Sequence, residues 1–342
     1  MANLNNPHRH IGLPTLWDGD PVMPSVNVQA VTDLLARCPD AAVTPMIDAS
    51  KIAEDMGIAR LSLKDETARM GMGSFKALGA AYVIAHDATA GVARGKTYVA
   101  ASAGNHGLSI AAGARIFGAK SVILLAETVP ESFADRLRRE GAEVVRRGTV
   151  YEESMRAAME LAAENDWTLL SDSSWPGYTE IPHRLMEGYL KMAAEAVEQI
   201  EEQPTHIFLQ AGVGGLAAAV AAYARHIWGD DPYITVVEPE RAPALLESVR
   251  AGAGVFADGP VSNMGRLDCK EPSLIALSGL ARDADQFVTV SDEQAMQTVT
   301  RLADLGVLTT PSGAAGVAAL RTANLPADAR VLCFISEVSD AA

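Results

Sequence analysis

The sequence predicts a doubly wound α/β protein with two lobes of parallel β-strands and an active site between the lobes. Two observations lead to this fold class. From residue 96 onward, short apolar stretches alternate with helical patterns of ten or more residues. Strands joined by helices of that length pair in parallel through right-handed crossovers. In addition, 342 residues with 49% apolar and 21% charged side chains suffice for a large core.

The first part of the chain is less regular than the rest. Residues 1–25 are polar and contain several prolines, which predicts an irregular arm. Helices are predicted at 28–35 and at 49–56, where Gly57 ends the second one. Leu61 and Leu63 alternate with polar residues, which favours a strand at 60–64. This strand leads into the small-residue loop 71–76 and then into an alanine-rich helix at 77–88.

The remaining elements follow in a steady order that ends with a strand at 330–335. Strands are predicted at 96–101, 121–126, 143–146, 167–170, 205–210, 233–237 and 287–290. Helices are predicted at 107–117, 130–140, 151–165, 184–199, 216–228 and 292–305, the last with Ser291 as its N-cap.

Composition and charge exclude several classes of protein. The net charge of −15 excludes nucleic acid and anionic membrane as partners, because both require a basic surface. The widely spaced Cys38, Cys269 and Cys333 indicate a reducing compartment and neither a disulfide framework nor a zinc site. The N-terminus is not an apolar leader, and no run of about 18 apolar residues occurs. We therefore expect a cytoplasmic protein.

Lys76 is the first candidate catalytic residue. It follows Phe75 in the small-residue stretch Gly71–Gly79, shortly after the charged segment Lys64–Glu66. Desolvation in apolar surroundings lowers the pKa of a lysine, and a neutral amine forms Schiff bases with aldehydes. An ordinary surface lysine at a helix start is the alternative.

A second candidate segment, Ala101–Gly107, joins a predicted strand to a predicted helix. The free N–H groups of a helix N-terminus there suit a substrate carboxylate, and Ser102 and Asn105 can add side-chain hydrogen bonds. A capped turn with a packed His106 explains the segment equally well.

The third segment is the glycine-rich turn Gly212–Gly215, again between a strand and a helix. Glycines let backbone amides close around a phosphate at a helix N-terminus. Glu238, at the end of the next strand, also makes the segment similar to a dinucleotide-binding fingerprint. An NAD(P)-dependent oxidoreductase is therefore a competing hypothesis. This hypothesis does not explain the segments around Lys76 and Asn105.

The fourth region is the C-terminal pair of segments Thr309–Ala314 and Cys333–Glu337. Ser336 stands at the end of the last predicted strand, where a hydroxyl can meet the ring nitrogen of a ligand.

Together the four regions resemble the pyridoxal-phosphate enzymes of fold type II, which include serine/threonine dehydratases and tryptophan synthase β subunits. The resemblance extends from Thr44 to Ser336. It implies that Lys76 binds the cofactor aldehyde and that Asn105 touches the ring hydroxyl. It also implies that Ser336 faces the ring nitrogen, which weakens the electron sink and is compatible with β-elimination. The phosphate would lie on Gly212, Val213, Gly214 and Gly215, with Phe75 also beside the cofactor.

Within this fold the sequence is most similar to the diaminopropionate ammonia-lyases. Lys64-Asp-Glu-Thr-Ala-Arg69-Met-Gly71, followed by Phe75-Lys76-Ala-Leu-Gly79, matches a pattern of that family. Asp172-Ser-Ser-Trp175-Pro-Gly-Tyr178-Thr-Glu-Ile-Pro182 matches another, and simple dehydratases differ there. The resemblance implies elimination of ammonia from a small amino acid such as 2,3-diaminopropionate, which gives a 2-oxo acid and ammonia. The substrate would lie against Ser102, Ala103, Gly104, His106 and Tyr178, although His106 also reads as a structural residue.

One position departs from the family pattern. Diaminopropionate ammonia-lyases carry an aspartate before Gly-Asn-His, implied to be the base for the D-substrate, whereas this chain has Ala103. Alanine cannot act as a base, so we expect action on L-configured substrates, with Lys76 as the sole base at Cα. Asp172 would hold a β-ammonium or protonate a poorer leaving group; a loop-turn aspartate is the alternative.

The sequence is also compatible with two other functions. A β-hydroxy L-amino acid such as serine, threonine or hydroxyaspartate would make the protein a dehydratase. A catalytically silent binding module with the same fold is a further class. The resemblance also implies a homodimer, with a large cofactor-binding lobe at 1–90 and 178–342 and a small mobile lobe at 91–177.

Overall fold

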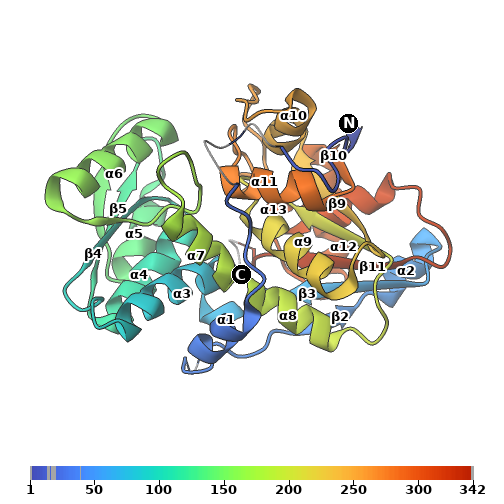
Figure 1. Cartoon of the computed structure of the whole chain (residues 1–342), viewed down its shortest axis with the longest axis horizontal. Coiled ribbons are helices and arrows are strands. Elements are labelled where there is room, and N and C mark those ends of the chain that lie inside the picture. The colour runs from blue at the N-terminus through green and yellow to red at the C-terminus, as the bar shows by residue number, and fades with distance from the viewer. Residues whose placement is uncertain (1, 14–15, 17–20, 39, 340–342) are drawn as a thin grey trace.

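The computed structural model describes residues 2–13, 16, 21–38 and 40–339, which form two β-sheets flanked by helices. The larger sheet has seven strands in the order β1-β10-β9-β8-β11-β3-β2, and the smaller has four in the order β6-β5-β4-β7. Figure 1 shows the smaller sheet with α4, α5 and α6 on one side of the molecule and the larger sheet on the other. The predicted α/β class with two parallel sheets is confirmed.

The parallel strands of the larger sheet form its centre, and its two edges are antiparallel. β10, β9, β8, β11 and β3 run parallel, whereas β1 and β2 pair antiparallel at the two edges. The strands are β1 (Asn3–Asn5), β2 (Met46–Asp48), β3 (Arg60–Asp65), β8 (His206–Gln210), β9 (Tyr233–Pro239), β10 (Gln286–Val290) and β11 (Arg330–Ile335). Those of the smaller sheet, all parallel, are β4 (Thr97–Ala101), β5 (Lys120–Leu125), β6 (Glu143–Arg146) and β7 (Thr168–Leu169).

Helices connect and cover these strands. They are α1 (Val28–Leu35), α2 (Ser50–Met56), α3 (Lys76–Thr89), α4 (Asn105–Phe117), α5 (Glu131–Arg139), α6 (Tyr151–Asn165), α7 (Glu180–Gly188), α8 (Leu190–Gln199), α9 (Gly215–Trp228), α10 (Ala244–Ala251), α11 (Leu274–Asp283), α12 (Asp292–Ala303) and α13 (Pro311–Ala318), with short 3₁₀ turns η2 (Arg69–Gly71) and η3 (Ala319–Arg321). None of the helices in the described part of the chain combines the length and apolar character needed to cross a bilayer.

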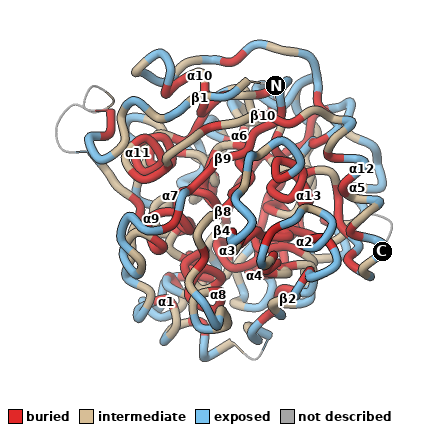
Figure 2. Tube along the Cα trace, turned by 90° about the vertical axis from the view of Figure 1, so that its right-hand side faces the viewer, coloured by how far each residue is buried: buried red, intermediate tan, exposed pale blue. Residues whose placement is uncertain are grey.

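Successive residues of the central strands face two different helix layers, as the two-residue period of a strand requires. Ile207 and Leu209 of β8 belong to a core shared with α9 and α11. Phe208, between them, belongs to a second core shared with α12 and α13. Figure 2 shows the buried backbone along β8, β9 and α11, with exposed segments at the margin. The sheet is therefore packed on both faces beneath its strand ends, where the candidate residues lie.

Several elements differ from the sequence-based expectation. The arm at 1–25 is not wholly irregular, because Asn3–Asn5 pairs with β10. The single helix expected at 184–199 is two helices, α7 and α8, separated at Tyr189. The break follows Gly188, where a Cβ would lie 2.5 Å from the carbonyl oxygen of Leu78 in α3. Helices α10, α11 and α13 and strand β2 were not predicted.

Candidate active site

The candidate residues lie where five parallel strands end. Lys76 follows β3, Asn105 follows β4, Asp172 follows β7, Gly212 follows β8 and Ser336 follows β11. Ligands of open α/β sheets bind outside the carboxyl ends of the strands. The fold thus brings segments from both sheets to one place.

Lys76 and Asp172 form an ion pair at this place. The Lys76 ammonium donates a hydrogen bond to Asp172 Oδ2, and the two side chains are 21% and 19% exposed. Burial is the largest single influence on Lys76 and would lower its pKa, but the charge and hydrogen bond of Asp172, together with the nearby Tyr189 and Cys269, outweigh it and raise that pKa above its usual value. Burial is likewise the largest single influence on Asp172 and opposes its ionisation, but the charge and hydrogen bond of Lys76, together with the nearby His106, outweigh it and lower the pKa of Asp172. The expected lowering of the Lys76 pKa by desolvation is therefore wrong for this structure, because the sequence does not reveal that Asp172 pairs with Lys76.

A buried network of charged groups holds the loop before Lys76. Arg69 donates hydrogen bonds to Glu66 and Glu195, and Lys64 donates to Glu195 at 2.8 Å. The side chains of these four residues are at most 1% exposed. Two cations balance two carboxylates, so no net charge is buried. The Lys64–Arg69 motif thus has a structural role beside the candidate lysine, Lys76.

The second segment caps α4 and also presents Asn105. The Ser102 hydroxyl accepts hydrogen bonds from the amides of Gly104 and Gly107. His106 is buried and contacts the Leu170 carbonyl through Nε2 at 2.9 Å. Burial lowers the pKa of His106, which keeps the ring neutral. His106 thus supports the end of β7, two residues before Asp172.

The loop after β7 is held by Tyr178. Its hydroxyl donates to the Leu169 carbonyl at 2.8 Å and accepts from the Ser171 amide at 3.1 Å. Its ring stacks on Trp175 with a centroid distance of 4.4 Å. Tyr178 therefore fixes the backbone just before Asp172 and packs on the Trp175 side chain just after it.

The turn from Gly212 to Gly215 forms a cradle of backbone amides. Gly214 has a φ of 101° and precedes α9, which has 14 residues. Within the described residues, no protein acceptor takes the amide hydrogens of Gly212, Gly214 or Gly215. A Cβ at Gly212 would approach the Arg266 carbonyl and the Cys269 sulfur at 3.1 Å each. This geometry suits an anionic group at a helix N-terminus.

Glu337, beside Ser336, is a site residue that sequence reasoning missed. The Ser336 carbonyl accepts from the Phe75 amide at 3.1 Å, which places the end of β11 against the loop that carries Lys76. Glu337 is buried, and its Oε2 accepts from Asn105 Nδ2 at 2.7 Å. Its position directly after a strand-end serine is the only sequence signal that could have identified it.

Tyr189 is a second missed residue. It is 1% exposed, its ring meets Phe75 at 4.8 Å, and its hydroxyl has no hydrogen-bond partner within the described residues. A Cβ at Gly215 would lie 3.3 Å from the Tyr189 ring. The unpaired hydroxyl therefore lies in the same neighbourhood as the glycine turn and Lys76. Burial raises the pKa of nearby Cys269 to about 12, so this thiol is not ionised at neutral pH.

Glu238 does not have the geometry of a dinucleotide site. It is fully buried, and its carboxylate accepts from the amides of Leu245 and Leu246 at 2.7 and 2.8 Å. Both amides belong to the first turn of α10, so Glu238 caps that helix. The carboxylate is unavailable to a ribose, which removes the basis of the oxidoreductase alternative.

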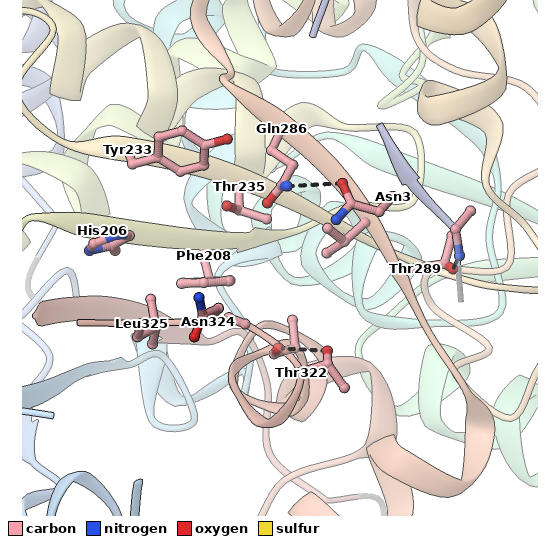
Figure 3. Close-up of a pocket in the computed structure, with 14 residues that line it drawn as sticks. Asn3, His206, Phe208, Tyr233, Thr235, Gln286, Thr289, Thr322, Asn324 and Leu325 are labelled. Carbon is pink, nitrogen blue, oxygen red and sulfur yellow. Dashed lines mark hydrogen bonds between the residues drawn. The ribbon is translucent and has the colours of Figure 1, made fainter. Parts of the chain in front are cut away.

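A cavity of about 500 Å³ lies elsewhere, at the opposite ends of the strands. Figure 3 shows His206, Tyr233 and Gln286, the first residues of β8, β9 and β10, around it. It contains none of the candidate residues. Nor do the described residues include a group of three or more His, Cys, Asp or Glu side chains that could hold a metal ion.

Comparison with known protein families gives a match over most of the chain. The family described as "Pyridoxal-phosphate dependent enzyme" matches residues 39–337. Diaminopropionate ammonia-lyase of Escherichia coli K12 is 31% identical over 274 residues, which cover 74% of this chain and 69% of that protein. L-threonine ammonia-lyase of Thermotoga maritima is 27% identical over 251 residues, covering 72% and 59%.

Solved structures agree with the sequence comparison. Diaminopropionate ammonia-lyase from Escherichia coli, in complex with an aminoacrylate-PLP azomethine reaction intermediate, superposes with a TM-score of 0.89 at 26% identity. The match covers 99% of this chain and 94% of that one. The same enzyme in complex with D-serine gives the same TM-score.

Proposed function

The chain belongs to the family of pyridoxal-phosphate-dependent enzymes, and from that premise we propose that it is an ammonia-lyase for a small L-amino acid such as 2,3-diaminopropionate. The products would be a 2-oxo acid and ammonia. Elimination at Cβ with this cofactor is the chemistry common to its relatives, and the identity of the substrate is our inference. The observation that carries it is the Lys76–Asp172 ion pair where the strand ends meet.

The residues present fit pyridoxal phosphate. The free amides of Gly212, Gly214 and Gly215, with Val213 between them, would hold its phosphate at the start of α9. Lys76 would bind its aldehyde, with Phe75 alongside. Ser336 would face the ring nitrogen, and Asn105 the ring hydroxyl. When bound, the cofactor withdraws electrons from Cα and so makes the Cα proton acidic.

Lys76 would move the proton at Cα. Its amine pairs with Asp172 at these strand ends, and it becomes a base only in its neutral form. Asp172 holds Lys76 in place and favours its charged form. Proton transfer therefore requires that this pair be rearranged when substrate enters.

Asp172 would also select the leaving group. A carboxylate that pairs with the Lys76 ammonium can equally pair with the β-ammonium of 2,3-diaminopropionate. Tyr178 and His106 hold the backbone around Asp172, so the carboxylate is preorganised for this contact. Ser102 and Gly104, at the start of α4, would receive the substrate carboxylate.

Ala103 supports an L-configured substrate. The E. coli relative has been solved with D-serine, whereas this chain has no ionisable group at position 103, so Lys76 would be the only base at Cα. A second candidate function rests on the same position, because Ser-Ala-Gly-Asn-His also occurs in many threonine dehydratases. It is the dehydration of serine, threonine or hydroxyaspartate.

A substrate panel tests these proposals. Purified protein should be yellow, and borohydride reduction should remove the colour and add the mass of the cofactor at Lys76. β-Substituted L- and D-amino acids would then be scored for ammonia and 2-oxo acid. We expect turnover of L-diaminopropionate above that of L-serine and L-threonine. Comparable turnover of D-diaminopropionate would refute the role given to Ala103, and faster turnover of a hydroxy acid would favour the dehydratase.

The small unit at 91–177 would move toward the large one as substrate binds, and two chains would associate as a homodimer. Both proposals come from the resemblance to fold type II enzymes. Small-angle scattering with and without substrate, and light scattering of the purified protein, would test them.

A further inference from the structure

The carboxylate of Glu337 is held at three points between the two sheets. Oε2 accepts from Asn105 Nδ2 at 2.7 Å and lies 3.0 Å from Arg266 Nε, and Oε1 accepts from the Thr310 hydroxyl. The side chain is only 4% exposed. A buried carboxylate is destabilising unless donors and an opposite charge surround it, and here both are present.

The partners of Glu337 are themselves fixed. The Thr310 hydroxyl accepts from the Gly313 amide at 3.0 Å as the N-cap of α13, so its hydrogen is directed at Glu337. The Arg266 amide donates to the Ser312 hydroxyl at 3.1 Å. Glu337 and Ser74 also form a β-bridge beside the reactive loop. The carboxylate therefore occupies one position relative to α13 and to Lys76.

This position determines how the Asn105 side chain is oriented. An asparagine amide can turn over and exchange its NH₂ group for its oxygen. A carboxylate only accepts hydrogen bonds, so Glu337 requires the NH₂ group of Asn105 to face it. One N–H is used in that bond, and the second remains for an acceptor in the site. Within the described part of the chain, no other protein group binds the Asn105 side chain.

We propose that Glu337 is a positioning residue that fixes the Asn105 amide for the cofactor and joins the start of α4 to the end of β11. The inference deepens the proposed function, since it rests on Asn105 contacting the cofactor ring hydroxyl. That hydroxyl, when ionised, needs an N–H donor, and a turned-over amide would present an oxygen instead. Glu337 thus acts on the cofactor through Asn105 and without touching it.

The test compares Glu337→Gln, Asn105→Ala and the double variant. The readouts are the dissociation constant for pyridoxal phosphate with the apo-protein and the visible absorption spectrum of the loaded protein. Glu337→Gln should weaken cofactor binding by roughly tenfold, which is what one hydrogen bond to a charged group contributes. Its absorption bands should shift toward those of Asn105→Ala. The double variant should bind no more weakly than Asn105→Ala alone, because one residue acts through the other.

Asp87→Asn is the matched control. Asp87 is a buried carboxylate with two partners, Lys96 and Tyr98, toward the other end of α3. Its replacement should lower the thermal midpoint and leave cofactor affinity and spectrum unchanged. If Glu337→Gln does not fold, Arg266→Gln loosens the same carboxylate and should produce the same shift of the bands.

Three outcomes would overturn the proposal. Glu337→Gln could behave like the control, with a lower thermal midpoint and an unchanged cofactor site. The effects of Glu337→Gln and Asn105→Ala could multiply in the double variant, which would mean independent roles. Asn105→Ala could leave cofactor binding unchanged, which would remove the assumed contact as well. None of these readouts uses turnover, so an error in the proposed substrate would not affect them.

Discussion

The Lys76 ammonium donates a hydrogen bond to the Asp172 carboxylate, although 96 positions separate the two residues in the chain. The pair joins the start of α3 to the loop after β7 and is one-fifth exposed. It holds Lys76 in its charged form, which is not nucleophilic. If Lys76 binds the cofactor aldehyde as proposed, it would first have to lose a proton that Asp172 stabilises.

Removal of the Asp172 charge should make cofactor capture less dependent on high pH. In Asp172→Asn, burial remains and lowers the pKa of Lys76, while the charge that raised it is gone. A larger fraction of Lys76 is then neutral at a given pH. The midpoint of the capture rate against pH, followed by absorbance after addition of pyridoxal phosphate to apo-protein, should move to lower pH. An unchanged profile would show that Asp172 does not control Lys76.

The same variant should distinguish between leaving groups. If Asp172 pairs with the β-ammonium, Asp172→Asn should lower kcat/KM for L-diaminopropionate by about 10- to 100-fold, which is what a hydrogen bond between charged groups contributes. A β-hydroxy substrate carries no such cation, so its kcat/KM should fall less. Equal losses for both substrates would assign Asp172 to a step that does not involve the leaving group.

Tyr189→Phe and Tyr98→Phe should have contrasting effects on stability and on cofactor affinity. Tyr189→Phe removes a buried hydroxyl that has no protein partner in the described structure, so the apo-protein should keep or gain stability by about 1 kcal/mol. Its affinity for pyridoxal phosphate should fall severalfold if the hydroxyl serves the cofactor. Denaturant unfolding and cofactor titration measure the two effects.

Tyr98→Phe is the counterpart. The Tyr98 hydroxyl donates to Asp87 at 2.7 Å, so its loss should destabilise the protein by about 1–2 kcal/mol and leave cofactor affinity unchanged. If Tyr189→Phe behaves like Tyr98→Phe, its hydroxyl has a structural partner such as water.

The sequence predicted the framework of the fold because most of its elements are defined by local patterns. The strand at 143–146, the helix at 151–165 and the strand at 330–335 agree with the structure to the residue. Helix α13 escaped prediction because Gly313 and Gly316 in its interior give it low helix propensity. Tertiary packing overrides that propensity, since a Cβ at Gly316 would lie 2.9 Å from Gln210 Oε1 of β8.

The sequence predicted which strand ends form the candidate site. It did not predict which side chains contact one another there. Lys76, Asn105 and Ser336 each follow a strand, and parallel strands bring their carboxyl ends together. The pairing of Glu337 with Asn105 depends on side-chain directions from two different sheets. No spacing in the sequence encodes such a contact. The role of Glu238 as a helix cap was hidden for the same reason.

Substitution of Gly214 should strain the local backbone and displace the backbone amides of the turn Gly212–Gly215. Its φ is 101°, and a Cβ would lie 2.9 Å from the Cβ of Ala276. Gly214→Ala should therefore be strongly destabilised and should lose most of its affinity for pyridoxal phosphate. Gly229, at the other end of α9, has a φ of 60° and open space around it. Gly229→Ala should show only the cost of a backbone conformation that side chains rarely adopt, about 1–3 kcal/mol, with normal cofactor binding. Equal behaviour of the two variants would contradict the cradle.

The buried network beneath the reactive loop should make stability depend on pH. The pKa of Glu195 is lowered, because Arg69 and Lys64 outweigh the opposing effect of burial. A carboxylate with a lowered pKa in the folded state stabilises the protein above its unfolded pKa. That stability is lost as the pH falls through the folded value. The loss of stability should therefore appear only below about pH 4.5, which is close to the ordinary pKa of a glutamate.

Glu195→Gln tests this dependence. At pH 7 it leaves Lys64 and Arg69 with one carboxylate between them, and the free energy of unfolding should fall by about 3–5 kcal/mol. The difference from the unmodified protein should shrink as the pH falls below about 4.5, because the native carboxylate is then being protonated. Urea unfolding at several pH values measures it. Glu131→Gln, which removes an exposed partner of Arg138 and Arg146, should change stability little at any pH. A difference between Glu195→Gln and the unmodified protein that stayed constant with pH would mean that Glu195 stabilises the loop by packing and not by charge.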